Sequence, residues 1–584
     1  GVRAALRGAP ARLARYGPHL LVAALVALAA AALFEPETKD ESHAFRMWLA
    51  GVGVALAAIR LSGRPLAWLR ERRAGRALVH AYFAALVAAC VLGVFNYYNF
   101  DGEEATGVGD GTDLAYYYLN TKYLEELGYH SFYAAALTAD KEHNDRHASK
   151  LRRYRDLRDY ELKSTRVAFE HGAEIKARRF TPERWEAFKH DLDYFLAFPQ
   201  MRALRGYFFA DHGYNPPPTW AVPGYALVAA TPVEHVKWVT LVDAACIVAA
   251  LVAVGWAFGV EAALFVLLFL VTTFSGRWPM LGHTLLRFDW SSLLVISVCL
   301  LKKERWALAG AALGYAALNR IFPAIFFFPW LVAAVADAWR ARRLPGRHVR
   351  FALGAAAAAA LLVVLAVGLF GADRLAESAQ NLVMHNDSYS SHRVGLADLL
   401  VYRGELTRAE INATGGMAAR EIAVQGTRHL RWGIGLAALA LIALYVARVR
   451  PPVHEAIHLA AMALFCVTTP QINYYNLRML FVVWHVSQLG RGWLHRAGLI
   501  LLFATEAVSH ASHVADNARF ATTAFTSIGL TVYFALIGGW MLWRIGGTFR
   551  APRPAAREVV PPRGRSSKRA PPRRACAPAR RRRR

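Results

Sequence analysis

Cysteine is scarce in this chain, with five residues among 584. No two of them form a Cys-x-x-Cys pair, and four fall within apolar segments. They are Cys90, Cys246, Cys299, Cys466 and Cys576. This spacing argues against both a disulfide framework and a cysteine-based zinc site.

Charged residues are also few, at 19% against 55% hydrophobic residues, and the mean hydropathy is +0.24. Acidic residues are fewer than basic ones, with 42 Asp and Glu against 69 Lys and Arg, so the formal net charge is +27. Between Arg550 and Arg584 stand 14 basic residues and one acid, Glu558. A Pro-rich, basic segment of this kind cannot bury a core, so we expect residues 546–584 to form a disordered tail and expect no nucleic-acid partner.

Long apolar runs separated by short charged connectors make up most of the remaining chain. Such runs are typical of a polytopic membrane protein, and we expect an all-α bundle of about 14 transmembrane helices. The first run follows several arginines and lacks a clear cleavage site, which favours a membrane helix over a signal peptide. The expected ranges are 18–34, 46–62, 78–98, 236–256, 259–275, 283–301, 306–319, 321–338, 351–370, 431–449, 454–469, 474–489, 496–511 and 522–545.

The short connectors are rich in Lys and Arg, and all fall on one side if these helices alternate. The positive-inside rule places that side in the cytoplasm, together with both termini of a multi-pass protein of the cell membrane. Two long polar segments, 99–235 and 371–430, then lie outside. We divide the chain into an arm with two additional helices (1–77), a transmembrane catalytic module (78–545) and the basic tail.

Residues 305–340 begin and end at basic positions but are too long and apolar for a cytoplasmic loop. We therefore expect two helices with an outer turn near Asn319, Arg320 and Pro323, which puts Arg320 at the outer membrane boundary. Both long polar segments also contain helix-start patterns, Thr181-Pro182-Glu183 in the first and a capping box from Thr407 to Glu410 in the second. They predict folded helices outside the membrane.

Polar residues that carry chemistry gather at this outer boundary. The stretch from Gly109 to Tyr133 places Asp110 and Asp113 before a helix that contains Tyr117 and Lys122. A carboxylate beside aromatic side chains is a candidate general base next to a sugar platform. A solvated loop with turn-forming glycines is the alternative interpretation. The acids from Asp101 to Asp113 are close enough to hold a divalent ion, but no cluster demands one, and we expect no cofactor.

Five motifs follow one another along roughly residues 80–490. They consist of Asp113, Tyr117, Gly128 and Tyr133, then Tyr214, Pro216 and Pro217, then Arg320 and Pro323, then Asn386 and Ser388, and last Thr469, Pro470 and Tyr475. The order of these motifs resembles that of the polyprenol-phosphate-mannose-dependent alpha-mannosyltransferases of the GT-C superfamily. Arg stands at position 320 where the family pattern has Lys.

This resemblance implies a GT-C-like bundle with loop helices outside the membrane. It also implies transfer of a sugar, most simply mannose, from a polyprenyl-phosphate donor to a glycan, glycolipid or protein acceptor. We expect Asp113, or Asp110, to be the base. Cations should stabilise the leaving phosphate, and the candidates are Arg320, His392 and Arg393. The candidate substrate-binding residues are Tyr117, Lys122, Tyr214, Arg287, Asp289, Asn386, Ser388 and Tyr475.

Two other classes remain open. A transporter or lipid flippase would share the helix count and a buried acid such as Asp243, but it would place charges deep in several helices. A non-catalytic membrane scaffold is the third class. The concentration of polar residues at one boundary favours the transferase.

Overall fold

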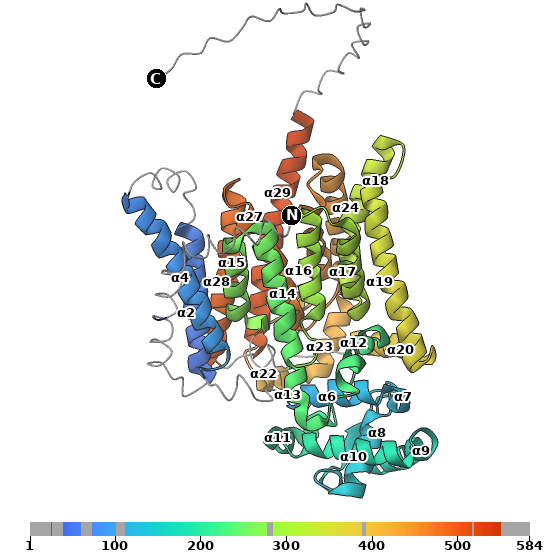
Figure 1. The fold of residues 1–584 in the computed structure, drawn as a ribbon. Helices are drawn as coiled ribbons and strands as arrows, with labels where there is room; N and C mark the ends of the chain where they lie inside the picture. The colour runs from blue at the N-terminus through green and yellow to red at the C-terminus, as the bar shows by residue number, and fades with distance from the viewer. Residues whose placement is uncertain are drawn as a thin grey trace, which may run out of the picture.

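Apolar helices run side by side through most of the molecule, and a smaller helical unit covers one end of them (Figure 1). The computed structural model describes residues 25, 39–59, 73–100, 111–276, 284–387, 393–516 and 519–550. We call residues 111–232 the cap, the adjoining end of the bundle the cap end, and the opposite end the basic end.

Eight helical segments of the described chain are long and apolar enough to cross a membrane. The protein is therefore an all-α membrane protein. These segments are α2 (Lys39–Ile59), α4 (Arg73–Tyr97), η2, α13 and α14 (Val233–His235, Val236–Val239, Leu241–Phe258), η4 and α18 (Phe322–Phe326, Phe327–Ala341), α19 (Gly346–Phe370), α24 (Arg428–Val449), α28 (Trp493–Asp516) and α29 (Arg519–Arg550).

The expected number of fourteen is larger than these eight, and the first expected helix, 18–34, lies outside the described residues apart from residue 25. The other ranges fall on helices that are shorter or broken into several parts. These are α15 (Val260–Thr272), η3 (Phe274–Gly276), α16 (Asp289–Lys302), α17 (Trp306–Asn319), α25 (Val453–Ala456), η5 (Ile457–Ala460), α26 (Ala461–Val467), η6 (Ile472–Arg478) and α27 (Met479–Ser487).

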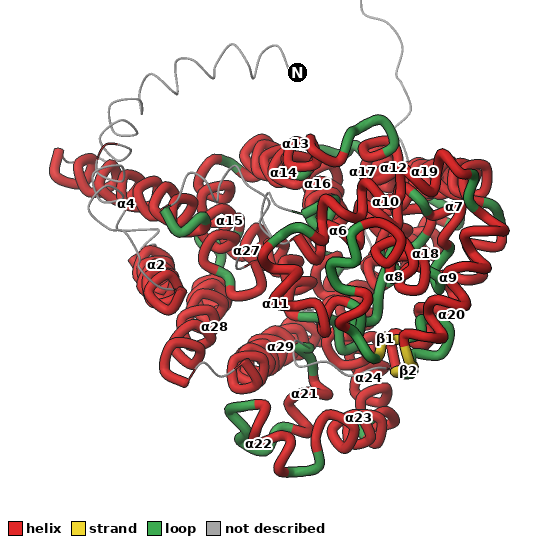
Figure 2. The backbone as a smooth tube through the Cα atoms, turned by 90° about the horizontal axis from the view of Figure 1, so that it is seen from below, coloured by secondary structure: helices red, strands yellow, loops and turns green. Residues whose placement is uncertain are grey.

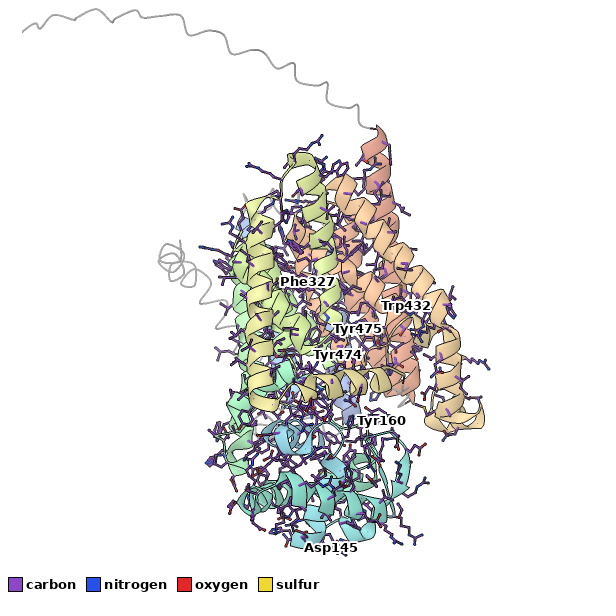
Figure 3. All side chains as sticks on the ribbon, turned by 90° about the vertical axis from the view of Figure 1, so that its right-hand side faces the viewer. Asp145, Tyr160, Phe327, Trp432, Tyr474 and Tyr475 are labelled. Atoms are coloured by element: carbon purple, nitrogen blue, oxygen red, sulfur yellow. The ribbon has the colours of Figure 1, made fainter. Side chains whose placement is uncertain are left out.

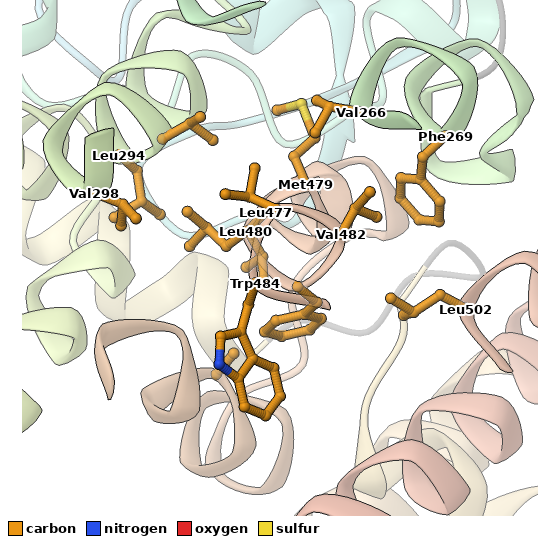
Figure 4. Packing of buried hydrophobic residues seen from close by; sticks show 14 of the residues in the cluster. Val266, Phe269, Leu294, Val298, Leu477, Met479, Leu480, Val482, Trp484 and Leu502 are labelled. Atoms are coloured by element: carbon orange, nitrogen blue, oxygen red, sulfur yellow. The ribbon is translucent and has the colours of Figure 1, made fainter. Parts of the chain in front are cut away.

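α27 lies in the middle of the bundle. Every residue from Met479 to Val486 is buried, and all of them except His485 are apolar. The His485 ring lies 2.9 Å from the Tyr533 hydroxyl, which gives this polar group a hydrogen-bond partner. Figure 4 shows these side chains between α15, α16 and α28. Viewed along the bundle, α2 and α4 lie at one edge (Figure 2).

α17 and α19 approach each other closely because small residues line their contact. A Cβ atom added at Gly310 would lie 1.9 Å from the carbonyl oxygen of Phe351, and one added at Gly354 would lie 1.9 Å from that of Ala307. Gly310 and Gly314 form the Gly-x-x-x-Gly spacing that permits backbone contact in membranes, where dispersion and close packing hold helices together. This contact fixes the end of α17, where Arg320 follows.

The described part of the chain carries exposed tryptophans on the lipid-facing side of α13 and α14. Trp238 is 63% exposed and Trp256 is 42% exposed. Their separation along the helix is about 27 Å at a rise of about 1.5 Å per residue, close to the hydrocarbon thickness of a bilayer. These indoles match the two aromatic belts of a membrane protein.

The cap packs around α6. In this helix every residue except Asp113 and Lys122 is buried, so Asp113 is left at the junction with the bundle. A short antiparallel hairpin pairs Arg153 with Ser164. The cap elements are α6 (Gly111–Lys122), α7 (Leu124–Leu127), α8 (Phe132–His143), η1 (Ala148–Lys150), β1 (Arg153–Arg155), β2 (Leu162–Ser164), α9 (Thr165–Arg179), α10 (Pro182–Leu196), α11 (Pro199–Phe208) and α12 (Pro218–Val228).

The second long polar segment lies at the same end of the bundle and docks on the cap (Figures 1 and 3). Asn381 accepts a hydrogen bond from the Tyr160 hydroxyl at 2.7 Å and donates one to the carbonyl of Tyr214 at 3.0 Å. Its elements are α20 (Asp373–Asp387), α21 (Leu396–Val401), α22 (Arg408–Ala413) and α23 (Gly416–Gly426).

Both predicted helix starts are confirmed. The Thr181 side chain accepts a hydrogen bond from the Arg184 amide, and the Thr407 side chain accepts one from the Glu410 amide. In the second helix start, the Glu410 carboxylate accepts a hydrogen bond from the backbone amide of Leu406. In the predicted capping box the donor would be the backbone amide of Thr407. The predicted turn after Asn319 is confirmed as the end of α17.

Replacing Gly354 by Ala should destabilise the protein by about 1–3 kcal/mol, because the new methyl group meets backbone atoms of α17 that cannot move aside. Gly368→Ala in the same helix is the matched control, since nothing lies within 4 Å of its Cβ position. Thermal unfolding in detergent measures both variants. Equal Tm values would contradict the close α17–α19 contact.

A reporter that is active only outside the cytoplasm, fused after Pro216 in the cap, should be active in cells. The same reporter fused after Arg305, between α16 and α17, should be inactive, because this connector belongs to the basic end. The reversed pattern would overturn the predicted orientation.

Candidate functional site

A buried carboxylate at the start of α14 shapes the loop before α16. Asp243 accepts hydrogen bonds from the Thr284 hydroxyl at 3.0 Å and from the amides of Arg287 and Phe288 at 3.1 and 2.9 Å. Its side chain is fully buried, so these three donors replace water. The backbone of Arg287 is thereby held in one position.

Arg287 reaches from this loop to the cap and pairs with Asp113. Its Nε lies 3.0 Å from one carboxylate oxygen of Asp113, and Nη2 contacts the other. The guanidinium carbon also lies 4.4 Å from the ring centroid of Tyr117. Asp113 stands in the first turn of α6, where the helix dipole favours a negative charge. This bidentate pair joins the bundle to the cap.

Tyr117 lies between the cations of the site. Burial raises the pKa of its hydroxyl above the ordinary value, and the nearby Arg287 and Arg320 guanidinium groups oppose this rise. The hydroxyl is therefore protonated near neutral pH and can act as a hydrogen-bond donor. Its ring packs edge-on against Trp220 at a centroid distance of 5.1 Å.

Arg320 is buried beneath Trp220 rather than open to lipid headgroups. Its guanidinium carbon lies 5.6 Å from the Trp220 ring centroid, and Nη1 donates to the carbonyl of Asn319 at 3.0 Å. Nε and Nη2 of Arg320 have no hydrogen-bond partner among the described residues, although both are buried. A buried guanidinium with two unused donors is suited to receive an anion.

Asp289 supports the same corner from the start of α16. It accepts hydrogen bonds from the Tyr315 hydroxyl at 3.0 Å and from the side-chain amide nitrogen Nδ2 of Asn319 at 2.7 Å. These bonds tie α16 to the end of α17 and so fix the residue that precedes Arg320. Asp289 therefore acts here through Asn319 and Tyr315.

Arg320 lines a cavity of about 400 Å³ at the cap end of the bundle. Most of its wall is apolar, and Arg320 and Arg393 are the two cations among the described residues of the lining. Apart from these two arginines, the described polar residues of the lining are uncharged. The wall includes Asn215, Pro217, Pro218 and Thr219 of the cap, Ile321 and Phe322 after α17, Leu375, Ser378 and Leu382 of α20, and Thr469, Pro470, Gln471 and Tyr474 before α27.

Arg393 is held at the cavity by the Thr-Pro turn before η6. Its Nη1 donates to the carbonyl and to the hydroxyl of Thr469, at 3.0 and 2.9 Å, and its backbone forms a bridge with Gln471. Tyr475 assists from behind, because its hydroxyl donates to the carbonyl of Val394 at 3.2 Å. Thr469 thus positions the guanidinium, and the bridge to Gln471 and the Tyr475 hydroxyl hold the backbone that carries it.

The structure brings together Asp113, Tyr117, Arg287, Asp289, Arg320 and Arg393 of the predicted site. Tyr214 and Tyr475 support it from behind, since Tyr214 packs on Tyr117 at 6.1 Å. Lys122 is directed elsewhere and pairs with Asp191 at 2.7 Å inside the cap. Asp110, Ser388 and His392 lie outside the described residues, as does the side chain of Asn386.

Sequence reasoning missed Trp220 and Tyr474. Trp220 follows the Pro-rich element directly, is fully buried, and packs against Tyr117 and Arg320 without lining the cavity. A large aromatic residue at the end of that element is the signal that could have found it. Tyr474 precedes the predicted Tyr475 in a 3-10 helix, where neighbours point in different directions, and it is Tyr474 that lines the cavity. Both tyrosines lie near the cap end (Figure 3).

Within the described ranges, no group of three or more His, Cys, Asp or Glu side chains has the arrangement of a metal site. Comparison of the chain with protein-family models, with curated proteins and with solved structures finds no match. The interpretation of the site therefore depends on its geometry and on the motif resemblance.

Replacing Asp243 by Ala should loosen the loop that carries Arg287, because two amides and one hydroxyl lose their acceptor. Hydrogen–deuterium exchange should show faster exchange in a peptide covering residues 284–288. Asp337→Ala at the basic end, which removes a partner of Arg347, is the control and should leave this peptide unchanged. Slow exchange in both variants would show that Asp243 does not hold the loop.

Proposed function

We propose that this protein is an integral-membrane glycosyltransferase that moves a sugar from a polyprenyl-phosphate donor to an acceptor on the extracytoplasmic side. The observation that carries the proposal is the cavity with Arg320 and Arg393 in an apolar wall, next to the Asp113–Arg287 pair. An apolar wall fits an isoprenoid chain, and guanidinium groups fit a phosphate. Mannose is the proposed sugar, on the motif resemblance.

In the proposed reaction the acceptor hydroxyl attacks the anomeric carbon of the donor sugar. The bond from this carbon to the lipid-phosphate oxygen breaks, its electron pair stays on the phosphate, and the acceptor proton passes to Asp113. Arg320 stabilises the phosphate as its charge increases, with two donors that other described residues do not use. Arg393 provides a second positive charge on the same wall.

Arg287 has a separate role in this proposal. A carboxylate that is held by a bidentate guanidinium is a weak base, so Asp113 must lose part of this contact before it accepts a proton. Arg287 lies close to Tyr474 of the cavity wall, as well as to Tyr117. A donor phosphate near Tyr474 would compete for Arg287 and release Asp113. Binding of the donor would thus activate the base.

The fold we propose is a GT-C-like bundle whose cap encloses the acceptor side. The described parts of the two long polar segments lie on one end of the bundle, and the connectors that carry Arg450 and Arg491 line one cavity at the other. The positive-inside rule then puts the cap outside the cytoplasm, where lipid-linked donors present their sugar. The proposed acceptor is a glycan, glycolipid or protein of the cell envelope.

The Asp113→Asn variant should transfer mannose from a short-chain polyprenyl-phosphate mannose about 10²–10⁴-fold more slowly than wild type, because the base is lost. Arg320→Gln should be slower by about 10²–10³-fold, because the leaving phosphate loses its charged donor. Transfer is measured with purified protein in detergent and a labelled donor.

Asp193→Asn is the matched control, because Asp193 pairs with Arg146 on the cap surface and should leave transfer unchanged. Full activity of Asp113→Asn would remove this residue from the mechanism. A wild type that transfers no sugar from any lipid-linked donor would remove the proposed function.

One observation favours the alternative of a transporter or flippase. Arg478 and Glu506 form an ion pair that is fully buried in the bundle, and 3-10 turns interrupt the chain at η4 and η6. Nη2 of Arg478 donates to the hydroxyls of Thr273 and Ser275 at 2.8 and 2.7 Å, and Nε donates to the carbonyl of Tyr475 at 3.1 Å, as expected of a structural pair. A lipid-flip rate in proteoliposomes that Glu506→Gln abolishes, without any sugar transfer, would support the alternative.

A further inference from the structure

The basic end of the bundle has a cavity of its own, of about 340 Å³. It lies between the end of α24, the Pro451–Pro452 turn, the end of α27, the start of α28 and the last part of α29. None of its lining residues belongs to the cap-end cavity. We call it the basic-end cavity.

Three arginines from three separate elements line the basic-end cavity: Arg450 after α24, Arg491 before α28 and Arg544 on α29. Glu455 is the single acid that the described residues contribute to the lining. It accepts a hydrogen bond from Gln488 at 2.7 Å and lies 3.7 Å from Arg491. Among the described residues no carboxylate pairs with Arg450 or Arg544. The lining therefore has an excess of positive charge.

Tryptophans form much of the remaining wall. Trp484 and Trp540 pack against each other at a centroid distance of 5.7 Å, and the Arg544 guanidinium lies 5.7 Å from the Trp540 ring. Trp493 and Trp543 are 63% and 70% exposed, so two indoles face the surroundings. Indole rings with this exposure at the end of membrane helices are typical of headgroup depth.

We propose that the basic-end cavity binds the phosphate headgroup of an anionic phospholipid from the leaflet that surrounds this end, which the positive-inside rule assigns to the cytoplasm. Arginine forks donate two hydrogen bonds at once to phosphate oxygens. Basic pockets between membrane helices on the cytoplasmic side are suited to anionic headgroups. The indoles would contact the glycerol and upper acyl region. This site is independent of the proposed sugar transfer.

A phosphate could also come from a soluble ester, so the experiment includes both sources. Purified protein is titrated with dioctanoyl phosphatidylglycerol, with dioctanoyl phosphatidylcholine and with glycerol 1-phosphate, and bound molecules are counted by native mass spectrometry. Wild type should retain the phosphatidylglycerol in preference to the other two. The double variant Arg450→Gln/Arg544→Gln should bind it at least about tenfold more weakly.

Arg343→Gln is the matched control, because Arg343 is exposed on a connector at the same end and does not line the cavity. It should bind like wild type. Arg450→Lys/Arg544→Lys keeps both positive charges but removes the guanidinium forks. Its binding of phosphatidylglycerol should be intermediate between that of wild type and that of the Gln double variant. Such partial binding would show that the Gln double variant loses the site and is not simply misfolded. Equal retention of both phospholipids, equal binding of glycerol 1-phosphate, or unchanged binding by the Gln double variant would overturn the proposal.

Discussion

A charge that is removed from water must meet a partner, and this constraint organises the junction between bundle and cap. Arg287 and Asp113 satisfy it for each other across the junction between the loop before α16 and the cap helix α6. Because neither partner tolerates burial alone, the cap is fixed in position over the bundle. With the cap in this position, α6 and α12 lie on the ends of α16 and α17. This places Tyr117 against Arg287 and Trp220 against Arg320.

The same constraint distinguishes two kinds of buried polar group, those whose hydrogen bonds are satisfied within the protein and those with donors that no described residue accepts from. Asp243 and the Arg478–Glu506 pair have hydrogen-bond partners throughout, so they hold backbone and helices in place. Arg320 differs, because two of its buried donors lack a partner among the described residues. The first set of groups is satisfied within the protein, whereas Arg320 keeps donor capacity at the wall of the cavity.

Much of the architecture could be predicted, because apolar runs and basic connectors report directly on membrane crossing. The pairing of Asp113 with Arg287 could not, since the two residues are 174 positions apart and nothing local links them. Arg320 was correctly placed at the end of α17, but its burial under Trp220 depends on how the cap docks. Tyr474 and Tyr475 differ only in the direction that a 3-10 turn gives them. The local sequence pattern therefore predicted the helices, whereas tertiary packing determined which side chains meet at the site.

The wall of the cap-end cavity has a consequence for biosynthesis. Its residues run from Asn215 to Tyr474, so a chain that is still being inserted contains the cap long before it contains the Thr-Pro turn and η6. Until that late segment arrives, Arg393 lacks the Thr469 oxygens that orient it, and α27 does not yet fill the bundle centre. A partly inserted chain thus lacks part of the cavity wall, and the cavity is complete only near the end of membrane insertion.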